Sequence, residues 1–320
     1  MSLEFPIFRF RFKALQYHAY TVWLFVFSDF KTIVVPSTIF GVTNAWAASK
    51  YDLHIPEALP PPQGVKDLPR LVLRTLLALS WVLVNFIPFA ISNQRGESAI
   101  AEDTLNKPWR PFPCRRISHE WGTRFMITLY IIAPVYSLMF SGGIRHSLAL
   151  ILLGVWYNNW GGADKNPIVR NIINGLGYTC FISGAMEVAI GGTLLPLHPR
   201  GLLGQWLLIL SAMIFSTVHL QDMSDQPGDA KKSRRTVPLV WGDGAARWTI
   251  AIPMIGWGVW CPMFWGVSSL WSLITVTMAC IVAVRTLVIR NVAGDQQTFR
   301  LWNCWIALVY ILPLGSQAGQ

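Results

Sequence analysis

Residues 71–111 read LVLRTLLALSWVLVNFIPFAIS and then NQRGESAIAEDTLNKPWRP, and this stretch decides the class of fold. The first part, 71–92, holds one charged residue, Arg74, and is long enough to cross a bilayer, which takes about 20 apolar helical residues. The second part, 93–111, is crowded with acids and bases. An apolar helix that ends in such a polar segment predicts a membrane protein whose polar side chains gather at the bilayer surface.

The composition of the whole chain agrees with this interpretation. Of the 320 residues, 53% are hydrophobic and only 13% are charged, about half the charged fraction of an ordinary globular protein. The mean hydropathy of +0.42 excludes disorder and disfavours a soluble enzyme. A net charge of +10 would suggest nucleic acid in a soluble protein. In a membrane protein the positions of Lys and Arg report topology instead, so we expect no nucleic-acid partner.

Nine apolar stretches are candidates for membrane-spanning helices. They lie at 20–47, 71–92, 123–141, 146–160, 170–192, 202–221, 245–263, 265–284 and 298–315. The segment 48–70 is polar and rich in proline, which predicts a loop. We therefore expect an all-α, polytopic membrane protein with nine transmembrane helices and a single domain over residues 1–320.

The basic residues are distributed unevenly between the two sides of these spans. With the N-terminus inside, the inner segments hold 19 of the 26 Lys and Arg residues, whereas the outer segments hold five. Basic residues concentrate on the cytosolic side of membrane proteins. We therefore expect an integral membrane protein, of the endoplasmic reticulum, with its N-terminus and polar loops in the cytosol and its C-terminus on the opposite side.

A second polar segment, DMSDQPGDAKKSRRTVP at 222–238, follows the sixth span. At 100° per residue, Asp222, Asp225 and Asp229 lie within about 60° of one another on a helix. Pro227 and Gly228 are expected to end or distort that helix, so the shared face holds best for the first two acids. In the first polar segment, Asn93 and Glu97 are also one helical turn apart.

Acids beside an apolar core are costly, about 2.5–3.5 kcal/mol each, unless they face a wet cavity and share cations. Carboxylate oxygens suit Mg²⁺, which binds through one or two carboxylates together with a substrate's phosphates. Bases follow both acidic segments, and the arginine fork matches phosphate oxygens. The pattern predicts a site for a diphosphate with an apolar tail. The alternative interpretation is a pair of solvated acidic loops.

At these residues the sequence resembles the UbiA superfamily of intramembrane prenyltransferases. Its first signature, Asn-x₃-Asp-x₃-Asp with a following Lys-x₂-Arg-Pro, is matched by Asn93, Glu97, either Glu102 or Asp103, and then Lys107 and Arg110. Glu97 departs from the expected Asp, and Ala101 occupies the expected last position. Its second signature is matched closely by Asp222, Asp225, Asp229, Thr236 and Gly242. The resemblance covers nearly the whole chain.

The resemblance implies a helical bundle around a central cavity, with motif loops at about 93–122 and 222–244, Mg²⁺ and a prenyl diphosphate. The metal ligands and catalytic residues it implies are Asn93, Glu97, Glu102 or Asp103, Asp222, Asp225 and Asp229. The diphosphate-binding residues it implies are Lys107, Arg110, Tyr157, Lys165, Arg234 and Arg235. The last two follow the second motif.

The motifs are most similar to the fungal branch of the superfamily, which includes class I terpene cyclases and aromatic prenyltransferases. We expect a cyclase that ionises farnesyl or geranylgeranyl diphosphate and closes the carbocation to a sesquiterpene or diterpene, releasing pyrophosphate. An aromatic prenyltransferase and a transporter of an anionic amphiphile remain the alternatives. Asp29 lies within the first span, and we expect it to pair with Lys31 or Arg74.

Overall fold

The computed structural model describes residues 4–51 and 68–316, except 141 and 196. Most of the predicted loop at 48–70 therefore lies outside the described residues. Within the described part of the chain, the structure is helical apart from one isolated bridge between Val267 and Ser316. The predicted all-α class is confirmed.

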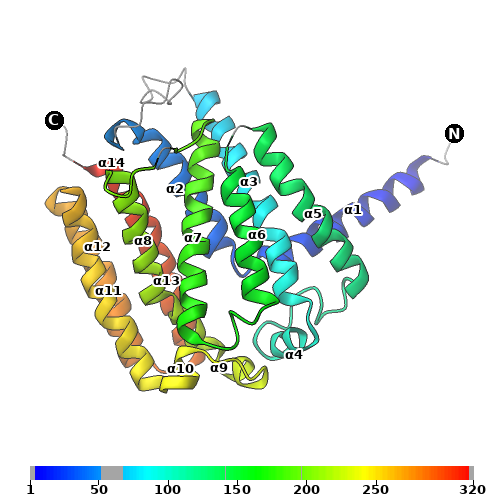
Figure 1. Cartoon of the computed structure of the whole chain (residues 1–320). Coiled ribbons are helices and arrows are strands. Elements are labelled where there is room, and N and C mark those ends of the chain that lie inside the picture. Colours follow the sequence, from blue (N-terminus) through cyan, green and yellow to red (C-terminus); the bar gives the residue numbers. More distant parts are fainter. Residues whose placement is uncertain (1–3, 52–67, 141, 196, 317–320) are drawn as a thin grey trace.

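Most of the long helices run side by side, and the short helices at 97–106, 222–231 and 237–241 lie together at one end of the bundle, the lower end in Figure 1. The α-helices are α1 Glu4–Val26, α2 Val35–Trp46, α3 Leu68–Gln94, α4 Glu97–Asn106, α5 His119–Met139, α6 Ile144–Asn158, α7 Pro167–Ile190, α8 Leu202–Thr217, α9 Asp222–Lys231, α10 Val237–Trp241, α11 Asp243–Trp265, α12 Ser269–Val288, α13 Val292–Tyr310 and α14 Leu312–Gly315. Three short helical turns join them: η1 Phe30–Val34, η2 Ala48–Tyr51 and η4 Val218–Gln221.

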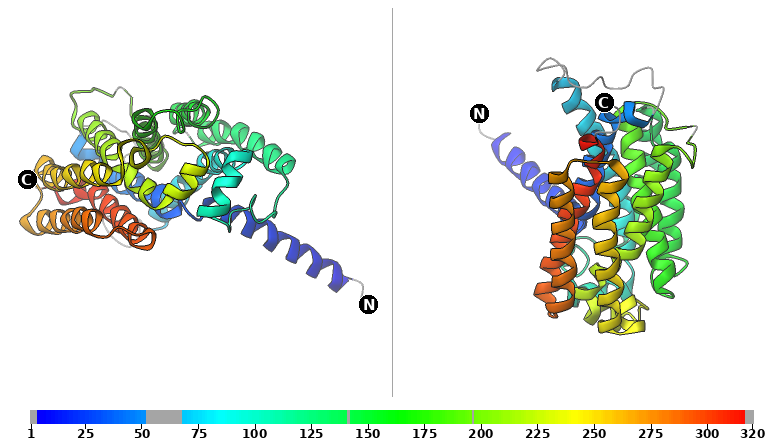
Figure 2. Two further views of the ribbon diagram at one scale, coloured as in Figure 1. Left: turned by 90° about the horizontal axis from the view of Figure 1, so that it is seen from below. Right: turned by 90° about the vertical axis from the view of Figure 1, so that its left-hand side faces the viewer.

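Helix α7 is the centre of the bundle. It packs against α2, α3, α6 and α8, and its last ten residues, Phe181–Ile190, are all buried. Helices α11, α12 and α13 form a further group on one side of it, whereas α1 extends away from the bundle (Figure 2). The end of the bundle that carries α4, α9 and α10 holds both polar segments that the sequence marks out.

Four helices are long and apolar enough to cross a membrane: α3, α5, α12 and the helix Leu202–Lys231, which contains α8. A fifth span results if the bent pair Lys13–Val26 and Phe30–Trp46 is taken as one. The other predicted spans fall on helices α6, α7, α11 and α13, which do not meet this criterion in the described residues. The number nine therefore stays a prediction.

The first span is broken, whereas the sequence analysis expected one helix over 20–47. Its two halves meet at an angle of 65°, and the break lies at Asp29, whose carbonyl accepts the N–H groups of Thr32 (3.1 Å) and Ile33 (2.8 Å). Pro36 lies at the start of α2. A proline has no N–H to donate and its ring crowds the preceding turn, so a new helix begins there more readily than an old one continues.

A buried arginine joins the ends of three helices on the α11–α13 side. Arg247 of α11 donates to Asp295 of α13 (2.8 and 2.9 Å), to Asp243 (2.9 Å) and to the carbonyl of Thr286 at the end of α12 (2.8 Å). The Arg247 and Asp295 side chains are only 2% and 3% exposed. This ion pair fixes the geometry of the α11–α13 group.

Replacing Arg247 with methionine is expected to lower the free energy of unfolding by about 3–5 kcal/mol, because it leaves the buried Asp295 charge without a partner. Thermal or denaturant unfolding in detergent measures the loss. Arg290→Gln is the control, since Arg290 is exposed and donates only to the carbonyl of Leu287. The double variant Arg247→Met/Asp295→Leu should recover part of the loss. Equal stability of Arg247→Met and Arg290→Gln would contradict this role.

Candidate active site

The two polar segments pack directly against each other, as α4 and α9. Asn106, the last residue of α4, donates to the carbonyl of Asp225 (3.0 Å) and accepts the N–H of Gly228 (3.2 Å). A side chain at position 228 would meet Asn106 at 2.2 Å, so only glycine allows this close approach. Residues 119 and 122 positions apart in sequence are thereby joined at one end of the bundle.

Pro227 and Gly228 were expected to end or distort the helix. Helix α9 continues through both residues to Lys231, so they do not end it. Proline at position 227 cannot donate to the carbonyl of Met223, and the side chain of Gln226 donates to that carbonyl instead (3.0 Å). The helix therefore tolerates the proline, and all three acids of the second motif lie on one continuous helix.

The prediction that Asn93 and Glu97 lie one turn apart on a single helix is wrong. Helix α3 ends at Gln94, and Gly96 is extended (φ −66°, ψ 145°) before α4 begins at Glu97. Asn93 lines the central cavity, whereas Glu97 is exposed. The break between the helices separates the two residues.

Bases of each motif pair with acids of the other. Lys107, which follows α4, bonds Asp225 of α9 (2.8 Å). In return Arg234, which follows α9, bonds Glu102 of α4 (2.9 Å) and Asp229 (3.1 Å). These reciprocal ion pairs connect the two motifs into a single charged cluster.

Within this cluster, Arg234 and Lys232 also lie beside Asp164, at 2.8 and 3.6 Å. Burial raises the pKa of Asp164, but the charges of Lys232 and Arg234 outweigh it and hold that pKa below its ordinary value. Asp164 therefore stays ionised and fixes the Arg234 guanidinium from a third side.

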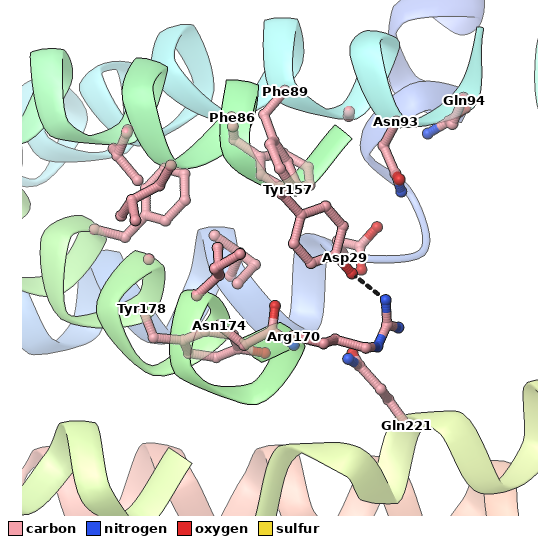
Figure 3. Close-up of a pocket in the computed structure, with 18 of the residues that line it drawn as sticks. Asp29, Phe86, Phe89, Asn93, Gln94, Tyr157, Arg170, Asn174, Tyr178 and Gln221 are labelled. Atoms are coloured by element: carbon pink, nitrogen blue, oxygen red, sulfur yellow. Dashed lines mark hydrogen bonds between the residues drawn. The ribbon is translucent and has the colours of Figure 1, made fainter. Parts of the chain in front are cut away.

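Arg170 is a site residue outside the predicted set. It lies in the first turn of α7 and bonds Asp222 through two nitrogens (2.8 and 3.3 Å) and the hydroxyl of Tyr157 (2.5 Å), as Figure 3 shows for the tyrosine. The resemblance assigned the base beside Tyr157 to Lys165, which is exposed. Asn166 caps α7 by accepting the N–H of Ile168, which starts the helix between the two bases. The sequence signal that could have identified Arg170 is its position three residues after the start of a helix that Asn166 caps.

A cavity opens from the charged cluster into the bundle, with about 1060 Å³ of empty space when the solvent at its mouth is included. Its charged end is lined by Glu102, Lys107, Arg110, Arg170 and Arg234 among others, and its other end is apolar and aromatic. The aromatic rings that line it, several of them labelled in Figure 3, belong to Phe86, Phe89, Tyr157, Tyr178 and Phe181. One cavity thus joins a strongly charged pocket to an apolar one.

Asp29, at the break in the first span, also lines this cavity. Its carboxylate lies 3.6 Å from Arg110, so the expected pairing with Lys31 or Arg74 is wrong. Lys31 donates instead to the carbonyl of Ser28 (3.2 Å). A second cavity lies beside the first and shares Asp29, Lys107, Gln221 and Asp225 with it.

The predicted residues fall into three groups. Those that line the central cavity are Asn93, Glu102, Lys107, Arg110, Tyr157, Asp225 and Arg234. Those that are buried directly behind the lining are Asp103, Asp222 and Asp229, which bond Arg110, Arg170 and Arg234 respectively. Those that are exposed and line neither cavity are Glu97, Lys165 and Arg235. Of the two alternatives in the first motif, Glu102 faces the cavity and Asp103 lies behind it.

The donor set at the charged end fits Mg²⁺. All candidate ligands offer oxygen atoms, which this hard cation prefers, and Oδ2 of the buried Asp229 has no hydrogen-bond partner. Across the described residues no three His, Cys, Asp or Glu side chains converge on one point. Asp225, Asp222 and Asp229 pair instead with Lys107, Arg170 and Arg234 respectively. Magnesium needs only one or two protein carboxylates when a substrate's phosphates complete its shell.

The chain is similar in sequence to known proteins of one family. The family model for the UbiA prenyltransferase family matches residues 34–305. Fumagillin beta-trans-bergamotene synthase of Aspergillus fumigatus is 28% identical over 237 residues, which cover 73% of this chain and 78% of that protein. Somaliensene A/B synthase of Streptomyces somaliensis is 25% identical over 303 residues, 91% of each chain.

The fold has a solved counterpart. A UbiA homologue from Archaeoglobus fulgidus, solved with DMAPP and Mg²⁺, superposes with a TM-score of 0.58 over 92% of this chain and 99% of that chain, at 11% identity. The family match, which covers most of the chain, together with candidate membrane-spanning helices, identifies an integral membrane protein. The chain belongs to the UbiA prenyltransferase family.

Proposed function

We propose that the protein is a class I terpene cyclase, which ionises a prenyl diphosphate such as farnesyl or geranylgeranyl diphosphate and closes the resulting carbocation into a ring. The observation that carries this proposal is the single cavity with a charged end and an aromatic end. The charged end suits a diphosphate, and the aromatic end suits a hydrocarbon chain that becomes a cation.

At the charged end, Lys107, Arg110 and Arg234 would bind the diphosphate oxygens, since all three line the cavity. Asp222, Asp225, Asp229, Asn93 and Glu102 are the residues that would hold Mg²⁺. When bound, Mg²⁺ neutralises the leaving diphosphate and so favours cleavage of the allylic C–O bond. Arg170 holds Asp222 in place through two hydrogen bonds and orients Tyr157 through a third.

Toward the aromatic end, the rings of Phe86, Phe89, Tyr178 and Phe181 would stabilise the migrating positive charge. A cation over a desolvated ring face gains about 2 kcal/mol. The apolar walls also keep water away, which would otherwise capture the cation as an alcohol. Loss of a proton from the cation then gives a cyclic hydrocarbon, and pyrophosphate is the second product.

The second candidate is an aromatic prenyltransferase, in which an acceptor captures the same carbocation. The observation in its favour is the second cavity beside the first, which offers room for an acceptor next to Lys107 and Asp225. The similarity to two terpene synthases over 73% and 91% of the chain supports the cyclase instead.

We also propose that the protein resides in the endoplasmic reticulum with the charged end of the bundle in the cytosol.

Incubation of the purified protein with Mg²⁺ and prenyl diphosphates, without an acceptor, tests the proposal. We expect pyrophosphate release that EDTA abolishes and added Mg²⁺ restores, because the diphosphate cannot leave without neutralisation. Turnover only after an aromatic acceptor is added would point to the prenyltransferase. No pyrophosphate release under any condition would contradict both enzymes and favour the transporter that the sequence left open.

A further inference from the structure

One face of α7 forms a wall of the central cavity. Its lining residues are Arg170, Ile173, Asn174, Gly177, Tyr178 and Phe181. At 100° per residue these six lie within an arc of about 140°, and Gly177 is near its middle. The residue without a side chain thus occupies the centre of the cavity wall.

Other glycines of α7 allow close packing, and Gly177 does not. A Cβ at Gly175 would lie 2.9 Å from the carbonyl oxygen of Ser211 on α8, and one at Gly184 would lie 2.2 Å from the ring of Trp81. A Cβ at Gly177 would meet nothing within 4 Å. Glycine lowers the stability of a helix relative to alanine, so packing accounts for the first two residues but leaves Gly177 without a structural reason.

Phe181 is the last residue of α7 that lines the cavity, and one turn further along α7 the ring of Trp81 packs against Gly184. Trp81 is fully buried, fills the space over Gly184 and donates to the hydroxyl of Ser137 (2.8 Å), which fixes its ring. Gly184 lies seven residues after Gly177, and Arg170 lies seven residues before it, so each is about 10 Å away along the helix. The open space at Gly177 is therefore midway along α7 between Arg170 at the charged end and the buried Trp81 ring at Gly184.

We propose that Gly177 sets the length of the prenyl chain that the enzyme accepts. The inference rests on the proposed function, since the prenyl chain is taken to occupy the apolar part of the central cavity. A chain that extends from Arg170 toward Phe181 passes Gly177, and any side chain there takes up volume that the distal isoprene units need. Short chains end before they reach this position and are little affected.

The test compares Gly177→Ala and Gly177→Leu with the wild type. The probes are unreactive prenyl S-thiolodiphosphates with geranyl, farnesyl and geranylgeranyl chains, and their dissociation constants are measured in the presence of Mg²⁺. We expect Gly177→Leu to weaken binding of the geranylgeranyl compound at least tenfold more than binding of the geranyl compound. Gly177→Ala should give a smaller change in the same direction.

Gly256→Leu is the matched control. Gly256 is a helical glycine of α11 whose Cβ would also meet nothing within 4 Å, but it is exposed and lines neither cavity. In this control, the ratio of the dissociation constants for the geranylgeranyl and geranyl compounds should stay within twofold of the wild type. The inference would be overturned if Gly177→Leu elutes as a monodisperse protein and its ratio of geranylgeranyl to geranyl dissociation constants equals that of the wild type. If the leucine variant does not fold, the same result in Gly177→Ala would overturn it. So would an equal shift in Gly256→Leu.

The binding measurement separates this inference from the proposed function. Thiolodiphosphates bind without being ionised, so a chain-length effect is detectable even in a protein that forms no cyclic product. Failure to release pyrophosphate from the normal diphosphates would count against the proposed function. Failure of the binding ratio to move would count against Gly177.

Discussion

Replacing Asp222 with asparagine is expected to reduce Mg²⁺-dependent pyrophosphate release at least about 100-fold, the effect of removing one stabiliser of charge that develops in a transition state. Asp222 is 1% exposed and accepts two bonds from Arg170. Its loss removes a carboxylate proposed to hold Mg²⁺ and frees the Arg170 guanidinium that orients Tyr157. Both changes weaken the charged end at the same time.

The control for this substitution is Glu120→Gln. Glu120 is exposed and pairs only with Arg124, one turn away at the start of α5. We expect its pyrophosphate release to remain within about twofold of the wild type, because exposed ion pairs contribute little. Asp222→Asn that retains more than a tenth of the wild-type rate, while folded, would contradict the assignment of Asp222.

Replacing Arg234 with glutamine is the second substitution from which we expect a large effect. Its guanidinium contacts Glu102, Asp229 and Asp164, and its side chain is 6% exposed. Without it, buried acids repel one another and a base proposed to bind the diphosphate is lost. We expect a fall in kcat/KM of about 100-fold, and a loss of about 3–5 kcal/mol of stability from the broken buried ion pairs.

Arg235→Gln is a matched comparison, because the sequence treats the two arginines alike and the structure separates them. The Arg235 side chain is exposed, and the main-chain N–H of Arg235 donates to the carbonyl of Asp164. We expect its kcat/KM to stay within about threefold of the wild type, as for other exposed charges. Arg234→Lys keeps the charge and should recover part of the activity. Equal losses in Arg234→Gln and Arg235→Gln would contradict the structural distinction.

The second motif could be predicted well from the sequence because its geometry is local. The spacing of Asp222, Asp225 and Asp229 is enough to place them on one helical face. The Pro227 prediction failed because a side chain, Gln226, replaces the missing main-chain donor, and propensity does not include such compensation. The prediction for the first motif failed at Glu97 because the chain leaves the helix at Arg95 and Gly96, and a spacing argument assumes one continuous helix.

The pairing between the motifs was beyond the reach of sequence reasoning. Lys107 directly follows the first acidic segment in the sequence, yet it bonds Asp225, 118 residues later. Arg170 and Asp29 reach the cavity from α7 and from the break in the first span. Which bases meet which acids depends on how the helices pack, and apolar periodicity constrains that packing only weakly. The 65° break was signalled by Pro36 and by a charged residue within an apolar span.

The measurement that tests the central claim most directly is the ratio of cyclic hydrocarbon to pyrophosphate in one reaction without an acceptor. Gas chromatography with mass spectrometry identifies the hydrocarbon, and an enzymatic assay counts the pyrophosphate. A cyclase that excludes water from its aromatic end gives about one cyclic molecule for each pyrophosphate. Pyrophosphate accompanied only by linear alcohols, or released only when an aromatic acceptor is present, would contradict the account.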